Sequence, residues 1–77
     1  METVIGKFYR HYKNGQLYQV LNFATHTETG EAMVVYQGLY DTDDLGPKPV
    51  FVRPREMFEE KVEINGKEVN RFSEVPK

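Results

Sequence analysis

The chain has 77 residues, no cysteine and a formal net charge of −2. This composition excludes disulfides, thiolate nucleophiles and cysteine-ligated zinc, and it provides no overall positive field that would attract nucleic acid or an anionic membrane. We therefore expect a single small β domain over residues 1–77, with an ordered core from about residue 6 to residue 72 and a cytoplasmic location.

The first half of the chain predicts three strands joined by two turns. Aromatic and β-branched residues concentrate at 7–12, 17–25 and 31–40, whereas residues 13–16 and 27–30 have the polar, glycine-containing composition of turns. Strands that follow one another through such short turns form an antiparallel meander.

The middle of the chain predicts a loop, a strand and one helical turn. Residues 41–49 are acidic, contain glycine and proline and show no periodicity, so we expect a long mobile loop. A strand is expected at 50–53. Pro54 fixes its own φ angle and favours a helical turn over residues 54–58.

The C-terminal part predicts a hairpin and a frayed end. Asn65-Gly66 is typical of a tight turn with positive φ at both central residues, and apolar alternation continues on either side of it, at 60–64 and 67–72. Residues 73–77 are expected to fray.

These elements predict an all-β fold, because no helical periodicity persists along the chain. The expected architecture is a small, partly open SH3-like barrel of about five or six short antiparallel strands, with the one short helical turn near residues 54–58. The alternative is a curved sheet that dimerises through an exposed face.

The turns also predict the register of the meander. If both turns close hairpins, Tyr12 lies opposite Leu17 and Leu21 lies opposite Tyr36. We therefore expect Leu21, Val34 and Tyr36 to form the centre of the core.

Polar and aromatic residues along the meander and at the end of the fourth strand form a candidate ligand site. Tyr and His rings with Arg side chains can stack on and clamp a nucleotide base, and His26 with Glu28 could place an imidazole and a carboxylate at one rim. The competing interpretations are core packing for the tyrosines and turn chemistry for His26 and Glu28. The candidates are Tyr9, Arg10, His11, Tyr18, His26, Glu28, Tyr36 and Arg53.

Arg53 is the most informative of these residues, because the following Pro54 holds it extended at a strand end. An arginine fixed in this way can meet a carboxylate or phosphate of a ligand, or form an internal pair with Glu28, Glu56 or the acidic loop. We expect it to be partly buried and bonded to a carboxylate or backbone carbonyl, with His26 or Tyr36 nearby.

The ordered motifs YRHYKNG, A-x-H-T-E-T, VVY-x-x-LY and VRP-x-x-MF resemble the small bacterial family known as domain of unknown function 1653. The resemblance covers roughly residues 6–72 and implies a small β domain of unassigned activity. The family usually has glycine where Asn14 stands and tryptophan where Phe51 stands.

Three classes of function remain after these exclusions. The first is a non-enzymatic binding module for a nucleic acid, a nucleotide or a peptide. The second is an assembly module that buries an apolar sheet face in a homodimer or a larger partner. The third and least favoured class is an enzyme, because the chain has one serine, Ser73, and no phosphate-binding loop or paired-carboxylate motif. We predict no metal site, no cofactor and no membrane partner.

Overall fold

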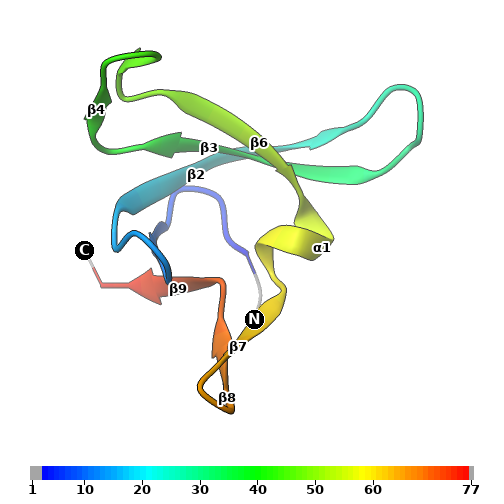
Figure 1. Ribbon diagram of the computed structural model, residues 1–77. Coiled ribbons are helices and arrows are strands. Elements are labelled where there is room, and N and C mark those ends of the chain that lie inside the picture. The colour runs from blue at the N-terminus through cyan, green and yellow to red at the C-terminus, as the bar shows by residue number, and fades with distance from the viewer. Residues whose placement is uncertain (1–2, 77) are drawn as a thin grey trace.

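A computed structural model describes residues 3–76 and shows an all-β chain with one helical turn (Figure 1). The strands are β1 (Phe8–His11), β2 (Leu17–Thr25), β3 (Ala32–Gly38), β4 (Asp41–Thr42), β5 (Gly46–Pro47), β6 (Val50–Pro54), β7 (Lys61–Ile64), β8 (Lys67–Asn70) and β9 (Phe72–Val75), and the helical turn is α1 (Arg55–Phe58). The predictions of an all-β fold and of a helical turn after Pro54 are confirmed.

Five of the strands form one antiparallel sheet in the order β6-β3-β2-β1-β9, and two separate hairpins, β4–β5 and β7–β8, extend from it. The sheet is curved but open, since no pairing joins β6 to β9 within residues 3–76. The structure therefore does not show a closed barrel. Its strands also outnumber the five or six that were expected, because the segment 41–49 and the C-terminal end contribute extra ones.

The C-terminal strand β9 corrects the expectation that residues 73–77 fray. Phe72–Val75 pairs with β1, with His11 opposite Phe72 and Tyr9 opposite Glu74. This pairing joins the two ends of the described chain, and sequence spacing gives no sign of it. Residue 77 lies outside the described residues.

The concave side of the sheet holds an aromatic core. Its fully or almost fully buried residues are Tyr9, Tyr18, Val20, Val34, Tyr36, Phe58 and Phe72. α1 places Phe58 against this side, where its ring stacks on Phe72 with centroids 4.1 Å apart and an interplanar angle of 6°. Most other ring pairs in the core meet edge to face, an arrangement that aromatic quadrupoles favour.

A β-bulge in β2 overturns the predicted position of Leu21. Val20 pairs with Tyr36, but the register shifts at Leu21, and Asn22 then pairs with Val35. The extra residue changes which side chains face the core. Val20 is completely buried and Leu21 is 38% exposed, so the prediction that Leu21 lies in the core is wrong, whereas Val34 and Tyr36 are buried as predicted.

The first hairpin also has a different register from the predicted one. Arg10, not Tyr12, lies opposite Leu17, a shift of two residues. Each side chain keeps its face under such a shift because strand side chains alternate with a period of two. The longer turn leaves residues 12–16 outside both strands.

The predictions for the two turn-rich segments in the second half of the chain differ in outcome. Asn65 and Gly66 have φ angles of 52° and 80° and join β7 to β8, which confirms the predicted tight hairpin. The segment 41–49 is not without structure, since Asp41–Thr42 pairs with Gly46–Pro47 and the Thr42 hydroxyl bonds both Leu45 and Gly46. Its mobility remains a prediction.

Candidate functional site

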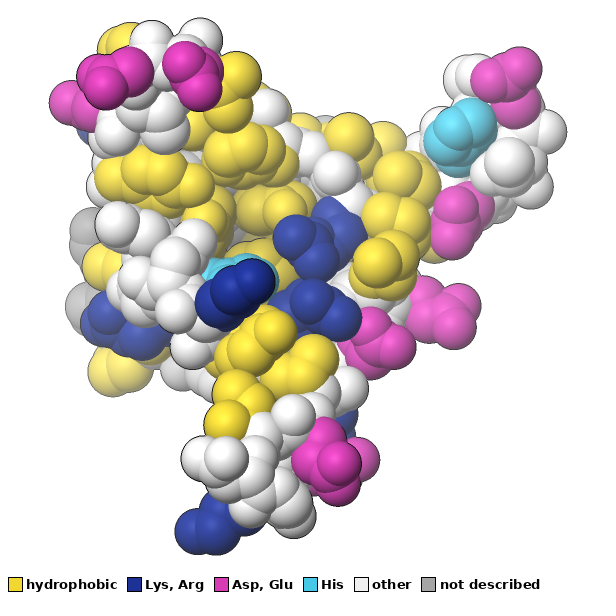
Figure 2. Space-filling view, viewed as in Figure 1, with side chains coloured by type: hydrophobic (Ala, Val, Ile, Leu, Met, Phe, Trp, Pro, Cys, Tyr) yellow, Lys and Arg dark blue, Asp and Glu magenta, His cyan; other side chains and the backbone are white. Residues whose placement is uncertain are grey.

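A pocket of about 270 Å³ lies on the concave side of the sheet. Its walls come from strands β1, β2, β3, β6 and β9 and from the turns next to them, and the lining residues are His11, Asn14, Tyr18, Tyr36, Tyr40, Phe51, Arg53 and Phe72. Figure 2 shows lysine and arginine side chains around a histidine at the centre of one face, with acidic side chains toward the periphery.

Arg53 is held in this pocket by aromatic side chains. Its Nε donates a hydrogen bond to the Tyr36 hydroxyl at 3.2 Å, and its guanidinium carbon lies 5.6 Å from the centroid of the Phe72 ring. None of the ion pairs within residues 3–76 involves Arg53. The prediction of partial burial next to Tyr36 is confirmed, whereas the predicted carboxylate or carbonyl acceptor is wrong, because the acceptor is a phenolic oxygen.

His11 presents a second donor to the same pocket. Its Nδ1 accepts the backbone N–H of Lys13 at 3.1 Å, so in the neutral ring the proton resides on Nε2. Burial lowers the pKa of His11 below its ordinary value of 6.5, and the positive charges of Arg53, Arg71 and Lys13 lower it further. Near neutral pH the imidazole is therefore an uncharged N–H donor.

Asn14 and two tyrosines form a hydrogen-bonded chain in the lining of the pocket. Asn14 Nδ2 donates to the Tyr18 hydroxyl at 3.1 Å, and the Tyr18 and Tyr40 hydroxyls lie 2.8 Å apart. Burial and the hydrogen bond with Tyr18 raise the pKa of Tyr40 to about 12. Tyr40 thus stays protonated and adds no negative charge to the pocket.

Gly38 makes room for the Tyr40 ring. A Cβ atom at position 38 would lie 2.8 Å from Tyr40 Cε1, closer than carbon atoms normally approach. The buried glycine therefore allows the ring to fold back over the end of β3 and reach Tyr18.

Several N–H and O–H groups of the pocket have no hydrogen-bond acceptor within residues 3–76. The Asn14 Oδ1 and His11 Nδ1 acceptors are already occupied by backbone N–H groups, and the Tyr36 oxygen accepts from Arg53. Within residues 3–76, the donors without a hydrogen-bond acceptor are the two terminal guanidinium nitrogens of Arg53, the Tyr36 O–H, the His11 Nε2–H and one O–H of the Tyr18–Tyr40 pair. The lining includes no aspartate or glutamate.

Comparison with known proteins identifies the family. Residues 7–74 match the family described as "Protein of unknown function (DUF1653)". The chain belongs to the DUF1653 family. It is similar to the crystal structure of a DUF1653 protein from Bordetella bronchiseptica, with 35% sequence identity and a TM-score of 0.79, over 97% of this chain and 91% of that chain. No curated protein matches the chain.

The structure brings together half of the site residues that the sequence suggested for this DUF1653 domain. His11, Tyr18, Tyr36 and Arg53 all line the pocket. Tyr9 belongs to the core instead, where its ring packs on Phe58 and its hydroxyl accepts the backbone N–H of Val4.

The other three candidates lie outside the pocket. Arg10 is exposed and donates to the carbonyl of Gly15. His26 and Glu28 lie in the turn between β2 and β3, where His26 Nδ1 accepts the backbone N–H of Glu28 and of Thr29. Their contacts are those of turn chemistry. Within residues 3–76 no group of three His, Asp or Glu side chains is placed to hold a metal ion.

Four pocket residues were not among the sequence candidates: Asn14, Tyr40, Phe51 and Phe72. The alternation Tyr36, Gly38, Tyr40 was an available signal, because residues two apart along a strand share a face. Phe72 enters the pocket only through the β1–β9 pairing.

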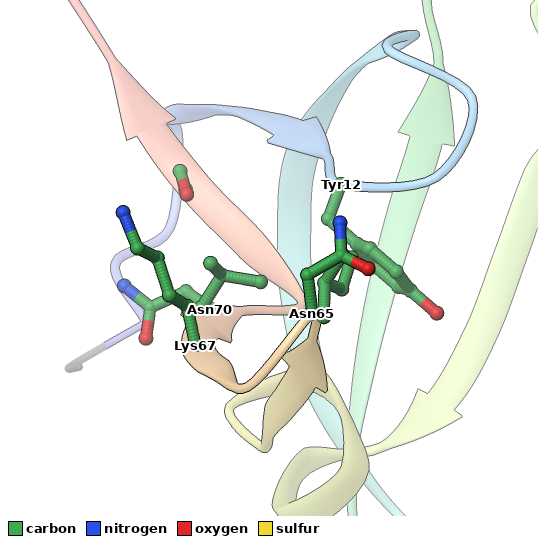
Figure 3. Close-up of a pocket in the computed structure, with 7 residues that line it drawn as sticks. Tyr12, Asn65, Lys67 and Asn70 are labelled. Atoms are coloured by element: carbon green, nitrogen blue, oxygen red, sulfur yellow. The ribbon is translucent and has the colours of Figure 1, made fainter.

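A second, larger pocket of about 570 Å³ lies beside the β7–β8 hairpin (Figure 3). Tyr12 and Asn65 lie on one side of it and Lys67 and Asn70 on the other. Its polar lining combines the Lys67 ammonium group with amides and hydroxyls that can accept as well as donate. It lacks the one-sided donor character of the first pocket, so we regard the Arg53 pocket as the candidate site. No helix in residues 3–76 has the length and apolar character needed to cross a membrane.

Proposed function

We propose that this DUF1653 domain is a non-enzymatic binding module for organic anions, which places the carboxylate or phosphate of the ligand at Arg53 and its apolar or flat body against the aromatic walls. The observation that carries this proposal is the donor character of the pocket. Within residues 3–76, Arg53 has no carboxylate partner, and the His11 N–H and the Tyr36 O–H beside it have no acceptor. An anion in the pocket would supply acceptors to these donors and would form charge-assisted hydrogen bonds with Arg53.

The five aromatic rings of the pocket alone would also suit a cation, because aromatic side chains attract positive charge through their faces. Arg53 decides between the two charges. A ligand cation would meet the guanidinium at close range with no carboxylate in the lining to compensate, whereas an anion gains a bidentate partner.

The volume of the pocket indicates the size of the ligand. A pocket of about 270 Å³ lies just below the usual range for small-molecule sites, which begins at about 300 Å³. It suits a small organic acid, one nucleotide unit or one end of a peptide. The lining lacks serine, cysteine and acidic side chains, so it offers neither an acyl-transfer nucleophile nor a carboxylate base. The cysteine-free composition is compatible with a reducing compartment such as the cytoplasm.

The test uses three probes of one shape and different charge: benzoate, benzamide and benzamidine, each titrated into the isotope-labelled domain and followed by NMR. Benzoate should shift resonances of His11, Arg53 and Tyr40 and should bind at least about tenfold more tightly than benzamide, because its carboxylate forms charge-assisted hydrogen bonds. Adenosine monophosphate in parallel tests the phosphate-bearing members of the class.

The variant Arg53→Gln should abolish the preference for benzoate. Arg10→Gln is the matched control, because Arg10 is exposed and lies outside the pocket. Stronger binding of benzamidine than of benzoate would mean that the rings form a cation site, and benzoate binding that is unaffected by Arg53→Gln would place the anion elsewhere. Either result contradicts the proposal.

A further inference from the structure

The charges that surround His11 in the Arg53 pocket are all of one sign. Three basic side chains lower its pKa, those of Arg53, Arg71 and Lys13. Among the described residues no carboxylate acts on this imidazole in the opposite direction. Figure 2 shows such a gathering of lysine and arginine side chains around a histidine, with the acidic side chains toward the periphery. An anion next to His11 would therefore interact with more positive charge than that of Arg53 alone.

The ring of Phe72 brings the donors of three strands together. The guanidinium carbon of Arg53 lies 5.6 Å from the centroid of this ring, and the centroid of the His11 ring lies 4.8 Å from it. The Tyr36 ring, whose hydroxyl accepts from Arg53, is also a neighbour, with centroids 5.5 Å apart. Arg71 directly precedes Phe72 in the chain, and its side chain is 18% exposed.

Glu60 is the carboxylate that offsets part of this positive charge. It accepts a hydrogen bond from Arg71 Nη2 at 2.8 Å, while Arg71 Nε is buried and has no hydrogen-bond partner within residues 3–76. None of the ion pairs in the described part of the chain involves Arg53 or Lys13. Because one carboxylate accompanies three cations, two positive charges remain uncompensated around the pocket.

We infer that the anion recognised by the pocket is a phosphate monoester, whose terminal oxygens accept from Arg53, Tyr36 and His11 while its flat or apolar body lies against the aromatic walls. This inference rests on the proposed function, since it takes the pocket to be an organic-anion site and names the anion. A phosphate monoester has three acceptor oxygens and carries nearly two negative charges near neutral pH, because its second pKa is about 6. A carboxylate has one charge on two oxygens and would leave one of the two positive charges uncompensated.

Two probes of one shape and different charge test this inference. Phenyl phosphate carries nearly two negative charges at about pH 7.5, whereas phenyl sulfate carries one on a tetrahedral group of the same geometry. NMR titrations of the isotope-labelled domain should show that phenyl phosphate binds at least about tenfold more tightly. Arg53→Gln should weaken the binding of both probes.

Two charge variants should change this preference in opposite directions. Lys13→Gln removes an uncompensated cation and should lower the ratio of the two affinities about two- to fivefold at low salt. Glu60→Gln removes the compensating charge, keeps an oxygen that can accept from Arg71, and should raise the ratio by a similar factor. Both side chains are exposed, and circular dichroism checks that the variants fold. Lys7→Gln and Glu28→Gln are the matched controls, because they make the same charge changes at exposed positions outside the pocket.

The outcomes separate this inference from the proposed function. Equal binding of phenyl sulfate and phenyl phosphate, both weakened by Arg53→Gln, would overturn the inference and leave the organic-anion site standing. A ratio that moves in the same direction in Lys13→Gln and Glu60→Gln would also overturn it, and so would a pocket that binds benzoate but not phenyl phosphate. A pocket that binds neither benzoate nor phenyl phosphate would contradict the proposed function as well.

Discussion

One type of turn occurs twice in this molecule, over residues 11–16 and 26–31, in very different surroundings. In each, a histidine Nδ1 accepts the backbone N–H two residues later, the histidine carbonyl accepts the N–H of a glycine four residues later, and the histidine N–H donates to the carbonyl five residues later. Gly15 and Gly30 have φ angles of 70° and 76°. The local sequence pattern H-x-x-x-G therefore specifies the same turn in both hairpins.

The surroundings give the two histidines different properties. His11 packs edge to face on Phe72 with ring centroids 4.8 Å apart, and it shares a pocket with Arg53. His26 lies at the end of the β2–β3 hairpin, and none of the ring contacts found within residues 3–76 involves it. The comparison teaches that a local motif can position an imidazole, but that long-range packing determines whether it becomes part of a site.

Phe72 packs against His11 in the first turn, and His26 in the second turn has no such ring contact within residues 3–76. Phe72→Ala should have the largest effect of the variants proposed here. The ring is completely buried and contacts His11, Tyr18, Tyr36 and Phe58. Its loss should lower the free energy of unfolding by about 3–5 kcal/mol, which approaches the total stability of a small domain. Urea unfolding measures this value, and a loss below about 1 kcal/mol would show that the aromatic cluster does not hold the first turn in place.

The bulge in β2, between the two turns, can be tested with neighbouring residues. Val20→Ala removes two buried methyl groups and should cost about 2 kcal/mol, whereas Leu21→Ala at an exposed position should cost less than about 1 kcal/mol. Chemical denaturation of the two variants under identical conditions provides the comparison. A larger loss of stability for Leu21→Ala than for Val20→Ala would contradict the bulge and support the predicted register.

Gly15→Ala and Gly30→Ala test whether the two turns are equivalent. Each substitution places a side chain at positive φ where no other atom lies within 4 Å, so the cost comes from the backbone alone. We expect a loss of about 1 kcal/mol for each variant. Losses that differ by more than about 1 kcal/mol in matched thermal melts would mean that the surroundings change the turn itself as well as its histidine.

The smallest effect concerns pH. The folded-state pKa of His11 lies below 6.5, so the unfolded chain binds a proton more readily as pH falls through 6.5. The stability contributed by neutral His11 is present above that pH and is lost progressively down to the folded-state pKa. Unfolding curves at pH 7.5 and 5.5 should therefore differ less in His11→Gln than in the wild type. An equal difference would assign the pH dependence to other groups.

Much of the fold followed from local chemistry. The Asn-Gly turn and the helical turn after Pro54 each depend on residues close in sequence or on a fixed φ angle, whereas Arg53 lies beside Tyr36 because β6 pairs with β3. The sequence analysis missed the bulge at Leu21, although a neighbouring residue indicates it. Asn22, a residue type that strands disfavour, bonds the backbone N–H of Phe23 through its side chain.

The candidate site was harder to predict because its parts come from five strands. Phe72 reaches His11 only after β9 pairs with β1, and no spacing rule connects residues so distant in the chain. The sequence also could not show that Arg53 would lack an ion-pair partner, since several carboxylates were available to it. The lack of an ion-pair partner for Arg53 within residues 3–76 is a property of the packed structure alone.

Gly38 makes one wall of the pocket adjustable by a single substitution. The Tyr40 ring occupies the space that a side chain at position 38 would need. An alanine there would force the ring away from its place beside Tyr18 and would change the shape of that wall of the pocket. Position 38 is therefore a place at which one substitution would alter the choice of ligand by reshaping the pocket, with every polar side chain of its lining retained.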